Sequence, residues 1–312
     1  MDPQVQALLD MMTAANADAP KLWEQTPQEA RATAEAMFGA MNAGAPDLAS
    51  TVDRTIPGPA GEIPIKVQTP LGDGPFPLLV YIHGGGFVIG SPDSHSRLSA
   101  LLADGAKAVV VSVHYRLAPE HPAPAALEDC VAAVKWSLAN AAELGADVSR
   151  FAIGGDSAGG NLTAATCLKL RDTGQRLPDL QYLIYGAFDI DHSKPSYLRN
   201  GSGYFLEMDG INWFMKQYLP TEDLRTDPYV WPNHAENLAG LPPAFMQVGT
   251  LDPLLDETFV YGNRLALAGV PVDIRVYPDM IHGFLQMDAM LDRAKVAVAD
   301  GVAAVKAALH PA

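Results

Sequence analysis

The sequence predicts an α/β fold in which helices cover both faces of an open, mostly parallel sheet. Continuous apolar runs of β-forming residues recur along the chain, as expected of strands that are buried on both faces. Segments with helical spacing of apolar residues separate these runs, and such alternation is typical of α/β proteins. The 312 residues are 48% hydrophobic and 18% charged, which suits one large core domain with a smaller attached part.

The elements can be placed in order along the chain. Residues 1–45 carry apolar side chains at helical spacing, whereas residues 51–58 and 61–70 alternate and are broken by glycine and proline, as the strands of a hairpin are. The buried runs that follow are FPLLVYI, KAVVVSV, RFAIGG, LQYLIYG, PAFMQVG and VDIRVYP. Helices are expected at about 125–142, 158–172, 256–268 and 287–308.

Residues 192–240 interrupt this alternation between two predicted strands. The segment is too long for a simple crossover, and it is rich in large apolar side chains. These side chains include Tyr204, Phe205, Leu206, Trp213, Phe214, Met215 and Tyr218. We therefore predict inserted helices that form a cap together with residues 1–45, over an α/β core built from residues 46–191 and 241–312.

Charge and composition narrow the range of partners and locations. The 21 basic and 36 acidic residues give a net charge of −15, which disfavours binding to nucleic acid or to anionic membranes. No apolar run approaches the roughly 20 residues that span a bilayer. No Lys or Arg precedes Lys21, so the basic region of a secretory signal is missing and a cytoplasmic location is predicted. The chain has no zinc-spaced Cys/His cluster and no complete phosphate-binding loop motif, so neither a metal nor a cofactor is predicted.

Residues 154–162, GGDSAGGNL, surround one serine, Ser157, with four glycines. Gly155 to Gly159 match the pattern G-x-S-x-G, and the stretch lies between a predicted strand and a predicted helix. A sharp turn of this kind holds the serine in a strained conformation and presses its neighbours against the backbone, where only glycine fits. The alternative is a glycine-rich turn without a chemical role.

A second glycine loop, HGGGF at residues 83–87, follows the run FPLLVYI. Backbone N–H groups that no side chain shields can stabilise the negative charge that forms when serine attacks a carbonyl group. A plain turn would account for one such loop. Two of them, in this order and after strands that look adjacent, favour an enzyme that transfers an acyl group through Ser157.

A serine nucleophile needs a base, and the base needs a group that orients it. In sheets with this elbow the acid and then the histidine follow the serine along the chain. His282 follows the last strand and Asp252 follows the strand before it, at the edge where open α/β sheets bind ligands. The less favoured histidines lie in or beside the cap or at the C-terminus: His192, His234 and His310. The less favoured acids lie in the next helix or too close to His282: Asp256, Glu257 and Asp279.

Five blocks resemble the hormone-sensitive lipase-like carboxylesterases of the α/β-hydrolase superfamily, in the subgroup with Asp before the serine. The blocks are HGGGF, YRLAPEHPAPAALED, GDSAGGN, DPLLDE and HGF, and the resemblance runs from about residue 45 to the end. It implies the α/β-hydrolase fold, with a mostly parallel eight-stranded sheet flanked by helices and a helical cap. It implies a carboxylesterase with Ser157 as nucleophile, Asp252 as acid and His282 as base.

The resemblance also implies the groups around the serine. The backbone N–H groups of Gly84, Gly85 and Ala158 would form the oxyanion hole, and His83 would brace their loop. Apolar residues beside the motifs and in the inserted segment are expected to line the substrate pocket: Phe87, Phe205, Leu206, Ile281 and Phe284. Two positions depart from the common family pattern and are expected to alter the pocket wall or cap: Trp231, which replaces a serine, and Leu255, which replaces a basic residue.

The expected reaction is hydrolysis of short- to medium-chain acyl esters through an acyl-enzyme, with a small-molecule ester as the partner. The same triad could instead cleave amides or carbamates or transfer acyl groups, because the oxyanion chemistry is shared. A non-catalytic small-molecule receptor on the same scaffold would lack the histidine, and His282 is present. Edge strands of the sheet could pair two chains, so a homodimer is also predicted.

Overall fold

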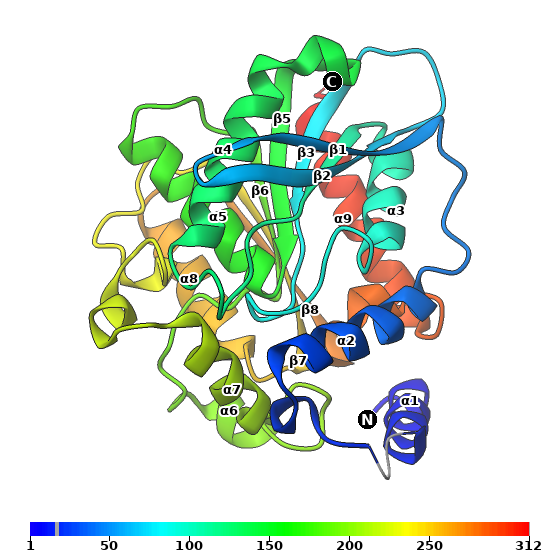
Figure 1. The fold of residues 1–312 in the computed structure, drawn as a ribbon, viewed down its shortest axis with the longest axis vertical. Coiled ribbons are helices and arrows are strands. Elements are labelled where there is room, and N and C mark those ends of the chain that lie inside the picture. Colours follow the sequence, from blue (N-terminus) through cyan, green and yellow to red (C-terminus); the bar gives the residue numbers. More distant parts are fainter. Residues whose placement is uncertain (16–18, 312) are drawn as a thin grey trace.

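The computed structural model describes residues 1–15 and 19–311; residues 16–18, in the predicted N-terminal helical segment, and residue 312 lie outside the described residues. Within the described residues the strands form one eight-stranded sheet in the order β1-β2-β4-β3-β5-β6-β7-β8 (Figure 1). The strands are β1 (Ser50–Gly58), β2 (Gly61–Thr69), β3 (Phe76–Ile82), β4 (Val109–Val113), β5 (Ala146–Asp156), β6 (Leu180–Ile184), β7 (Ala244–Leu251) and β8 (Val272–Ile281).

The predicted fold class is confirmed. β1 pairs with β2, and β2 with β4, in antiparallel directions, whereas every pair from β4 across to β8 is parallel. The predicted hairpin at residues 51–58 and 61–70 corresponds to β1 and β2, and the six apolar runs overlap β3 to β8. The eight strands and their order agree with the α/β-hydrolase fold that the resemblance implies.

The helices are α1 (Pro3–Ala15), α2 (Pro27–Met41), α3 (Ser96–Ala106), α4 (Ala125–Ala139), α5 (Ala158–Asp172), α6 (Pro195–Asn200), α7 (Met208–Tyr218), α8 (Leu255–Leu267) and α9 (Asp292–Leu309). The 3-10 turns are η1 (Leu22–Glu24), η2 (Ala141–Leu144), η3 (Glu222–Thr226), η4 (Pro232–His234) and η5 (Phe284–Met287). The four helices predicted after the hairpin correspond to α4, α5, α8 and α9. The last begins at residue 292 rather than 287, because Met287 ends η5 and a turn at residues 288–290 follows it.

Both faces of the sheet are buried, as the apolar runs predict. Leu78, Val80 and Ile82 of β3 join the core on the side of α4 and α5, while the intervening Leu79 and Tyr81 join the core on the side of α3 and α9. Figure 1 shows α4, α5 and α8 on one side of the strands and α3 and α9 on the other. Because successive strand residues point to opposite faces, a continuous apolar run supplies both cores at once.

The N-terminal segment and the helices inserted between β6 and β7 contact each other. α2 begins with a capping box in which Thr26 and Glu29 bond each other's backbone N–H groups. α6 and α7 lie in the insertion between β6 and β7, and a Cβ at Gly210 of α7 would lie 3.4 Å from Trp23 Cε3. The N-terminal segment therefore contacts the inserted helices. No helix in residues 1–15 or 19–311 combines the length and apolar character that crossing a membrane requires.

The topology brings the predicted reactive residues to one edge of the sheet. β3, β5, β7 and β8 are parallel, and they end immediately before His83, Ser157, Asp252 and His282. The carboxyl ends of parallel strands meet at the same edge, which is where ligands bind in open sheets.

Gly159 provides a test of the packing behind this edge. A Cβ at Gly159 would lie 1.9 Å from the carbonyl oxygen of Ile82, a backbone atom that cannot move without displacing β3. Because overpacking costs about 1–3 kcal/mol or more, we expect Gly159→Ala to lower the thermal unfolding midpoint by about 5 °C or more.

Gly39→Ala in α2 is the matched control, since a Cβ there meets nothing within 4 Å. Its unfolding midpoint should equal or exceed that of the wild type, because glycine is a poor helix former. Equal midpoints for Gly159→Ala and wild type, measured by circular dichroism, would contradict the tight contact.

Candidate active site

Ser157 occupies a strained turn between β5 and α5. Its backbone has φ 54° and ψ −118°, a conformation that side-chain-bearing residues rarely adopt. The Ser157 N–H donates to the carbonyl oxygen of Ile184 at 2.8 Å, which ties the turn to β6. A Cβ at Gly155 would lie 2.4 Å from the carbonyl oxygen of Ile82. The glycines therefore give clearance to a rigid elbow, as the sequence predicts.

Ser157, His282 and Asp252 form a continuous hydrogen-bonded chain. His282 Nε2 lies 2.9 Å from Ser157 Oγ, and His282 Nδ1 lies 2.8 Å from Asp252 Oδ2. Asp252 is completely buried, and its other oxygen accepts the Leu254 N–H at 2.8 Å. A carboxylate in this position makes Nδ1 the protonated nitrogen, so that Nε2 can accept the serine proton.

Four of the less favoured candidates lie elsewhere. His310 Nε2 is 3.0 Å from the last carbonyl oxygen of α3, and His234 is 3.2 Å from a carboxylate in the loop after β6. Asp256 accepts a backbone N–H at the start of α6 at 2.8 Å. The side chain of Asp279 is 43% exposed and lies 3.8 Å from the N-terminal amino group. Their contacts are therefore structural ones.

The loop after β3 requires a correction to the predicted oxyanion hole. The N–H of Gly84 donates to Asp156 Oδ1 at 3.0 Å in the buried interior. An N–H held by a carboxylate is not available to a developing oxyanion. By contrast, the N–H groups of Gly85, Gly86 and Ala158 donate to no acceptor within residues 1–15 and 19–311. Gly86 and Ala158 also line the cavity that contains the serine hydroxyl.

Asp156 is the centre of a buried polar network. Its Oδ1 also accepts the Tyr81 hydroxyl at 2.8 Å, and its Oδ2 lies 3.3 Å from His95 Nε2 and 3.4 Å from Gln286 Nε2. Burial raises the pKa of Asp156, but the charge and hydrogen bond of His95 and the Tyr81 hydroxyl outweigh it, so that the net pKa lies below its ordinary value. The carboxylate is therefore ionised at neutral pH.

His83 braces the same loop, in keeping with the sequence-based interpretation. Its ring stacks on Tyr115 with centroids 4.3 Å apart, and its Nδ1 lies 2.7 Å from the Gly84 carbonyl oxygen. The Tyr115 hydroxyl donates to the His83 carbonyl oxygen at 2.9 Å. Burial, with the nearby His95 and His114, lowers the pKa of His83 well below its ordinary value. The imidazole is therefore neutral.

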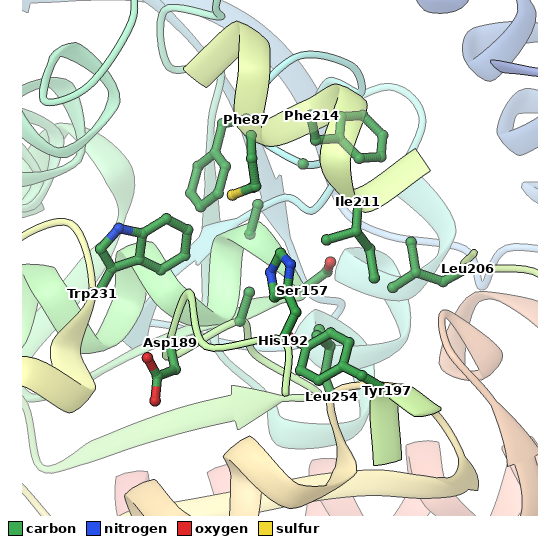
Figure 2. A pocket seen from close by; sticks show the side chains of 14 residues that line it. Phe87, Ser157, Asp189, His192, Tyr197, Leu206, Ile211, Phe214, Trp231 and Leu254 are labelled. Atoms are coloured by element: carbon green, nitrogen blue, oxygen red, sulfur yellow. The ribbon is translucent and has the colours of Figure 1, made fainter. Parts of the chain in front are cut away.

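A mainly apolar cavity opens beside Ser157 (Figure 2). Of the five residues predicted to line it, Phe87 and Leu206 do so. Trp231, which departs from the family pattern, is fully buried in the wall and meets Phe87 edge-to-face with centroids 6.4 Å apart. The lining residues that the sequence did not single out as pocket residues are Gly86, Ala187, Asp189, His192, Tyr197, Ile211, Phe214, Met215 and Leu254.

Three predicted pocket residues do not line this cavity. Ile281 and Phe284 are completely buried in the core beside α9, where the Phe284 ring packs against Tyr277 at 5.4 Å. Phe205 lies outside the cavity wall, and a Cβ at Gly283 would lie 3.4 Å from Phe205 Cε1. Proximity to a motif in sequence is therefore a poor guide to the pocket, because neighbouring residues point to opposite sides.

Glu257, a rival for the triad acid, instead holds the loop after β6. Its Oε2 accepts the N–H groups of Phe188 and Asp189 at 2.7 and 3.0 Å, and the Tyr197 hydroxyl bonds to its Oε1. The side chain is completely buried, and burial raises the pKa of Glu257 to about 8. Asp189 and Tyr197 both line the cavity, whereas Glu257 does not. Glu257 therefore fixes the position of two wall residues without facing the cavity itself.

Comparisons with known proteins agree with this geometry. Residues 79–286 match the model of a family described by the α/β-hydrolase fold. A carboxylic ester hydrolase of Mycobacterium tuberculosis, LipN, is 44% identical over 264 residues, which cover 82% of this chain and 69% of the relative. An ethyl acetate hydrolase of Pseudomonas putida is 38% identical over 238 residues, which cover 74% of each chain.

Solved structures show the same relationship. An ester hydrolase from the Lake Arreo metagenome has a TM-score of 0.95 and 38% identity, and 98% of each chain is covered. A hyperthermophilic esterase of Pyrobaculum calidifontis has a TM-score of 0.94 and 35% identity over 98% of each chain. The fold and these relatives define a carboxylic ester hydrolase. The chain belongs to the hormone-sensitive lipase-like family of α/β-hydrolases.

Glu257 gives the stability of the protein a specific pH dependence. The buried site favours protonated Glu257, so its contribution to the free energy of unfolding is complete at pH values below the unfolded-state pKa, near 4.5. That contribution is lost as the pH rises through the folded-state pKa of about 8. Glutamine keeps the acceptor oxygen and cannot ionise. We therefore expect the unfolding midpoint of Glu257→Gln, relative to wild type, to rise by several degrees between pH 5 and pH 9.

Differential scanning fluorimetry at the two pH values measures this difference. Glu62→Gln, at the exposed end of β2, controls for the removal of one acidic side chain. A midpoint difference between Glu257→Gln and wild type that is the same at both pH values would contradict ionisation of Glu257 in this range.

Proposed function

We propose that Ser157, His282 and Asp252 carry out ester hydrolysis through an acyl-enzyme. The observation that carries this proposal is the unbroken chain from Ser157 Oγ through the imidazole to Asp252, with contacts of 2.9 and 2.8 Å. His282 takes the serine proton as Oγ attacks the ester carbonyl carbon, and it then gives that proton to the departing alcohol. Water repeats the same steps on the acyl-enzyme and releases the acid.

The N–H groups of Gly85, Gly86 and Ala158 are the proposed oxyanion donors. They are unpaired within the described residues, and Ala158 begins α5, whose N-terminal end favours negative charge. Positive φ values of 118° and 57° at Gly85 and Gly86 let the loop turn its N–H groups in a way that other residues would not tolerate. Gly84 is left out because its N–H is bonded to Asp156.

Short acyl groups fit the cavity best. Its volume is about 50 Å³, and one water molecule needs about 10–15 Å³ by the same measure. The relative named for ethyl acetate hydrolysis is consistent with a short acyl group. We therefore place the preferred substrates at the short end of the short- to medium-chain range.

Residues that line the cavity also support the proposal of a cap. Ile211, Phe214 and Met215 of α7 line the cavity, and α7 meets the N-terminal segment at Trp23. We propose that residues 1–45 and 192–240 act together as a cap over the core of residues 46–191 and 241–312. The cytoplasmic location and the homodimer stay predictions from the sequence.

Replacing Ser157 tests the mechanism directly. Ser157→Ala removes the nucleophile, so we expect kcat/KM for 4-nitrophenyl acetate to fall by about 10⁴-fold or more. Ser137→Ala in α4 is the matched control, because the buried Ser137 hydroxyl has no hydrogen-bond partner in the part of the chain that the structure describes. It should keep wild-type turnover. Substantial hydrolysis by folded Ser157→Ala would rule out this nucleophile.

Phe214 allows a test of the acyl-chain range. We expect kcat/KM for 4-nitrophenyl esters to be highest between acetate and hexanoate and to fall by about tenfold or more at laurate, because the cavity is small. A Cβ at Gly86 would lie 2.4 Å from the Phe214 ring, so this ring closes the cavity over the glycine loop. Phe214→Ala should therefore shift the preference toward longer chains.

The control is Phe259→Ala on α8, since Phe259 is 38% exposed and does not line the cavity. It should leave the chain-length profile unchanged. A wild-type enzyme that prefers laurate, or a Phe214→Ala variant with the wild-type profile, would show that this cavity does not hold the acyl chain.

A further inference from the structure

His192 presents unused hydrogen-bonding atoms to the cavity. Its ring lines the cavity that contains Ser157, and Figure 2 shows it projecting inward from the loop after β6. Neither ring nitrogen pairs with any group within residues 1–15 and 19–311. The proposed mechanism does not use this side chain, because His282 is the residue that contacts Ser157 Oγ. Both ring nitrogens are therefore free to bond to a polar group of a ligand that fills the cavity.

The carboxylate in the wall, Asp189, is already occupied by protein donors. Its Oδ2 accepts from Lys194 Nζ at 2.9 Å and from Asn233 Nδ2 at 2.8 Å. Its Oδ1 accepts the N–H of Ile190 at 2.8 Å and lies 3.2 Å from His234 Nε2. Five donors, counting the Asp191 N–H at 3.2 Å, leave the carboxylate little capacity for a ligand.

The remaining wall near His192 is apolar. Leu206, Ile211, Phe214 and Leu254 face the same cavity (Figure 2). In such surroundings a hydrogen bond to His192 is stronger than it would be in water, and leaving it unmade costs more. The indole N–H of Trp231, in the same wall, also has no hydrogen-bond partner among the described residues.

The imidazole is held in place and is neutral. Its ring packs against Tyr197 with centroids 4.8 Å apart, and the Tyr197 hydroxyl is in turn bonded to the buried Glu257. Burial lowers the pKa of His192, and the positive charges of Lys194 and Arg225 lower it further, against the opposing carboxylates of Asp191 and Asp189. A neutral imidazole offers one N–H donor and one nitrogen acceptor and carries no charge.

We propose that His192 is a specificity residue that hydrogen-bonds a hydroxyl group on the part of the ester that fills the cavity. The preferred substrates are then short esters that carry a hydroxyl group, in the acyl or the alcohol portion, rather than plain alkyl esters. A hydroxyl group is both donor and acceptor, so it matches either tautomer of the ring. This inference rests on the proposed function, since it assumes that the ester reacts at Ser157.

Two pairs of esters with hydroxyl and methyl isosteres test the inference. The acyl pair is ethyl 3-hydroxybutanoate and ethyl 3-methylbutanoate, and the alcohol pair is 2-hydroxyethyl butanoate and propyl butanoate. The measured quantity is the ratio of kcat/KM for the hydroxyl ester to that for the methyl ester, from a pH-stat at pH 7.5. Intrinsic reactivity cancels when the ratio of a variant is compared with the ratio of the wild type.

His192→Phe keeps a ring against Tyr197 and removes both nitrogens. We expect this variant to lower the ratio about tenfold in one of the two pairs, and that pair identifies the portion of the ester that occupies the cavity. His192→Gln retains a donor and an acceptor and should restore at least part of the ratio. His121→Phe, at an exposed histidine outside the cavity, should leave both ratios at the wild-type values.

The outcomes separate this inference from the function on which it rests. Unchanged ratios in both pairs, for folded His192→Phe or for His192→Leu as a second variant, overturn the role of His192 while ester hydrolysis stands. A wild-type enzyme that hydrolyses none of the four esters overturns the proposed function and this inference together. A ratio that falls equally in His121→Phe also overturns the role of His192, because the effect is then not local to the cavity.

Discussion

The buried carboxylate of Asp156 connects the turn that carries the serine to the loop that follows β3. It accepts the Gly84 N–H at 3.0 Å and the Tyr81 hydroxyl at 2.8 Å, both from the β3 side, while its own backbone leads directly into Ser157. A Cβ at Gly84 would lie 2.5 Å from Asp156 Oδ2, so the two segments touch without a gap. The distance between Ser157 and the proposed oxyanion donors is therefore set before substrate arrives, and such preorganisation is a large part of catalytic electrostatics.

The loop that contains Asp252 is held by a few hydrogen bonds from the inserted segment. The side-chain amide of Asn200, the last residue of α6, donates to the carbonyl oxygens of Thr250 and Asp252 at 3.1 and 3.0 Å. The Ser196 hydroxyl donates to the Pro253 carbonyl oxygen at 2.6 Å. α6 therefore clamps the loop that aligns the histidine. The inserted residues do more than line the cavity, because they also stabilise the conformation of the loop that holds Asp252, the proposed triad acid.

The sequence allowed the sheet and the triad to be predicted because both have local signatures. Apolar runs mark strands that are buried on both faces, and the glycines around Ser157 mark a turn that other residues cannot form. α3 was not predicted, and it packs closely against α9: a Cβ at Gly105 would lie 2.5 Å from Val302 Cγ1 of α9. The donor role of Gly84 was assigned wrongly because sequence does not show which of three neighbouring N–H groups a carboxylate occupies.

The cavity walls were the least predictable part, and the reason lies in how they are held. Ser157, Asp252 and His282 each follow a hydrogen-bonded parallel strand, so the pairing of the strands fixes their relative positions. The wall is built from side chains of a loop and of inserted helices, which no strand pairing holds in register. Glu257 connects the strand-borne residues to the cavity wall. It is the third residue of α8, shortly after Asp252, and its carboxylate accepts N–H groups of the loop after β6. Side chains such as His192 can therefore differ between related enzymes while the reacting groups keep one geometry.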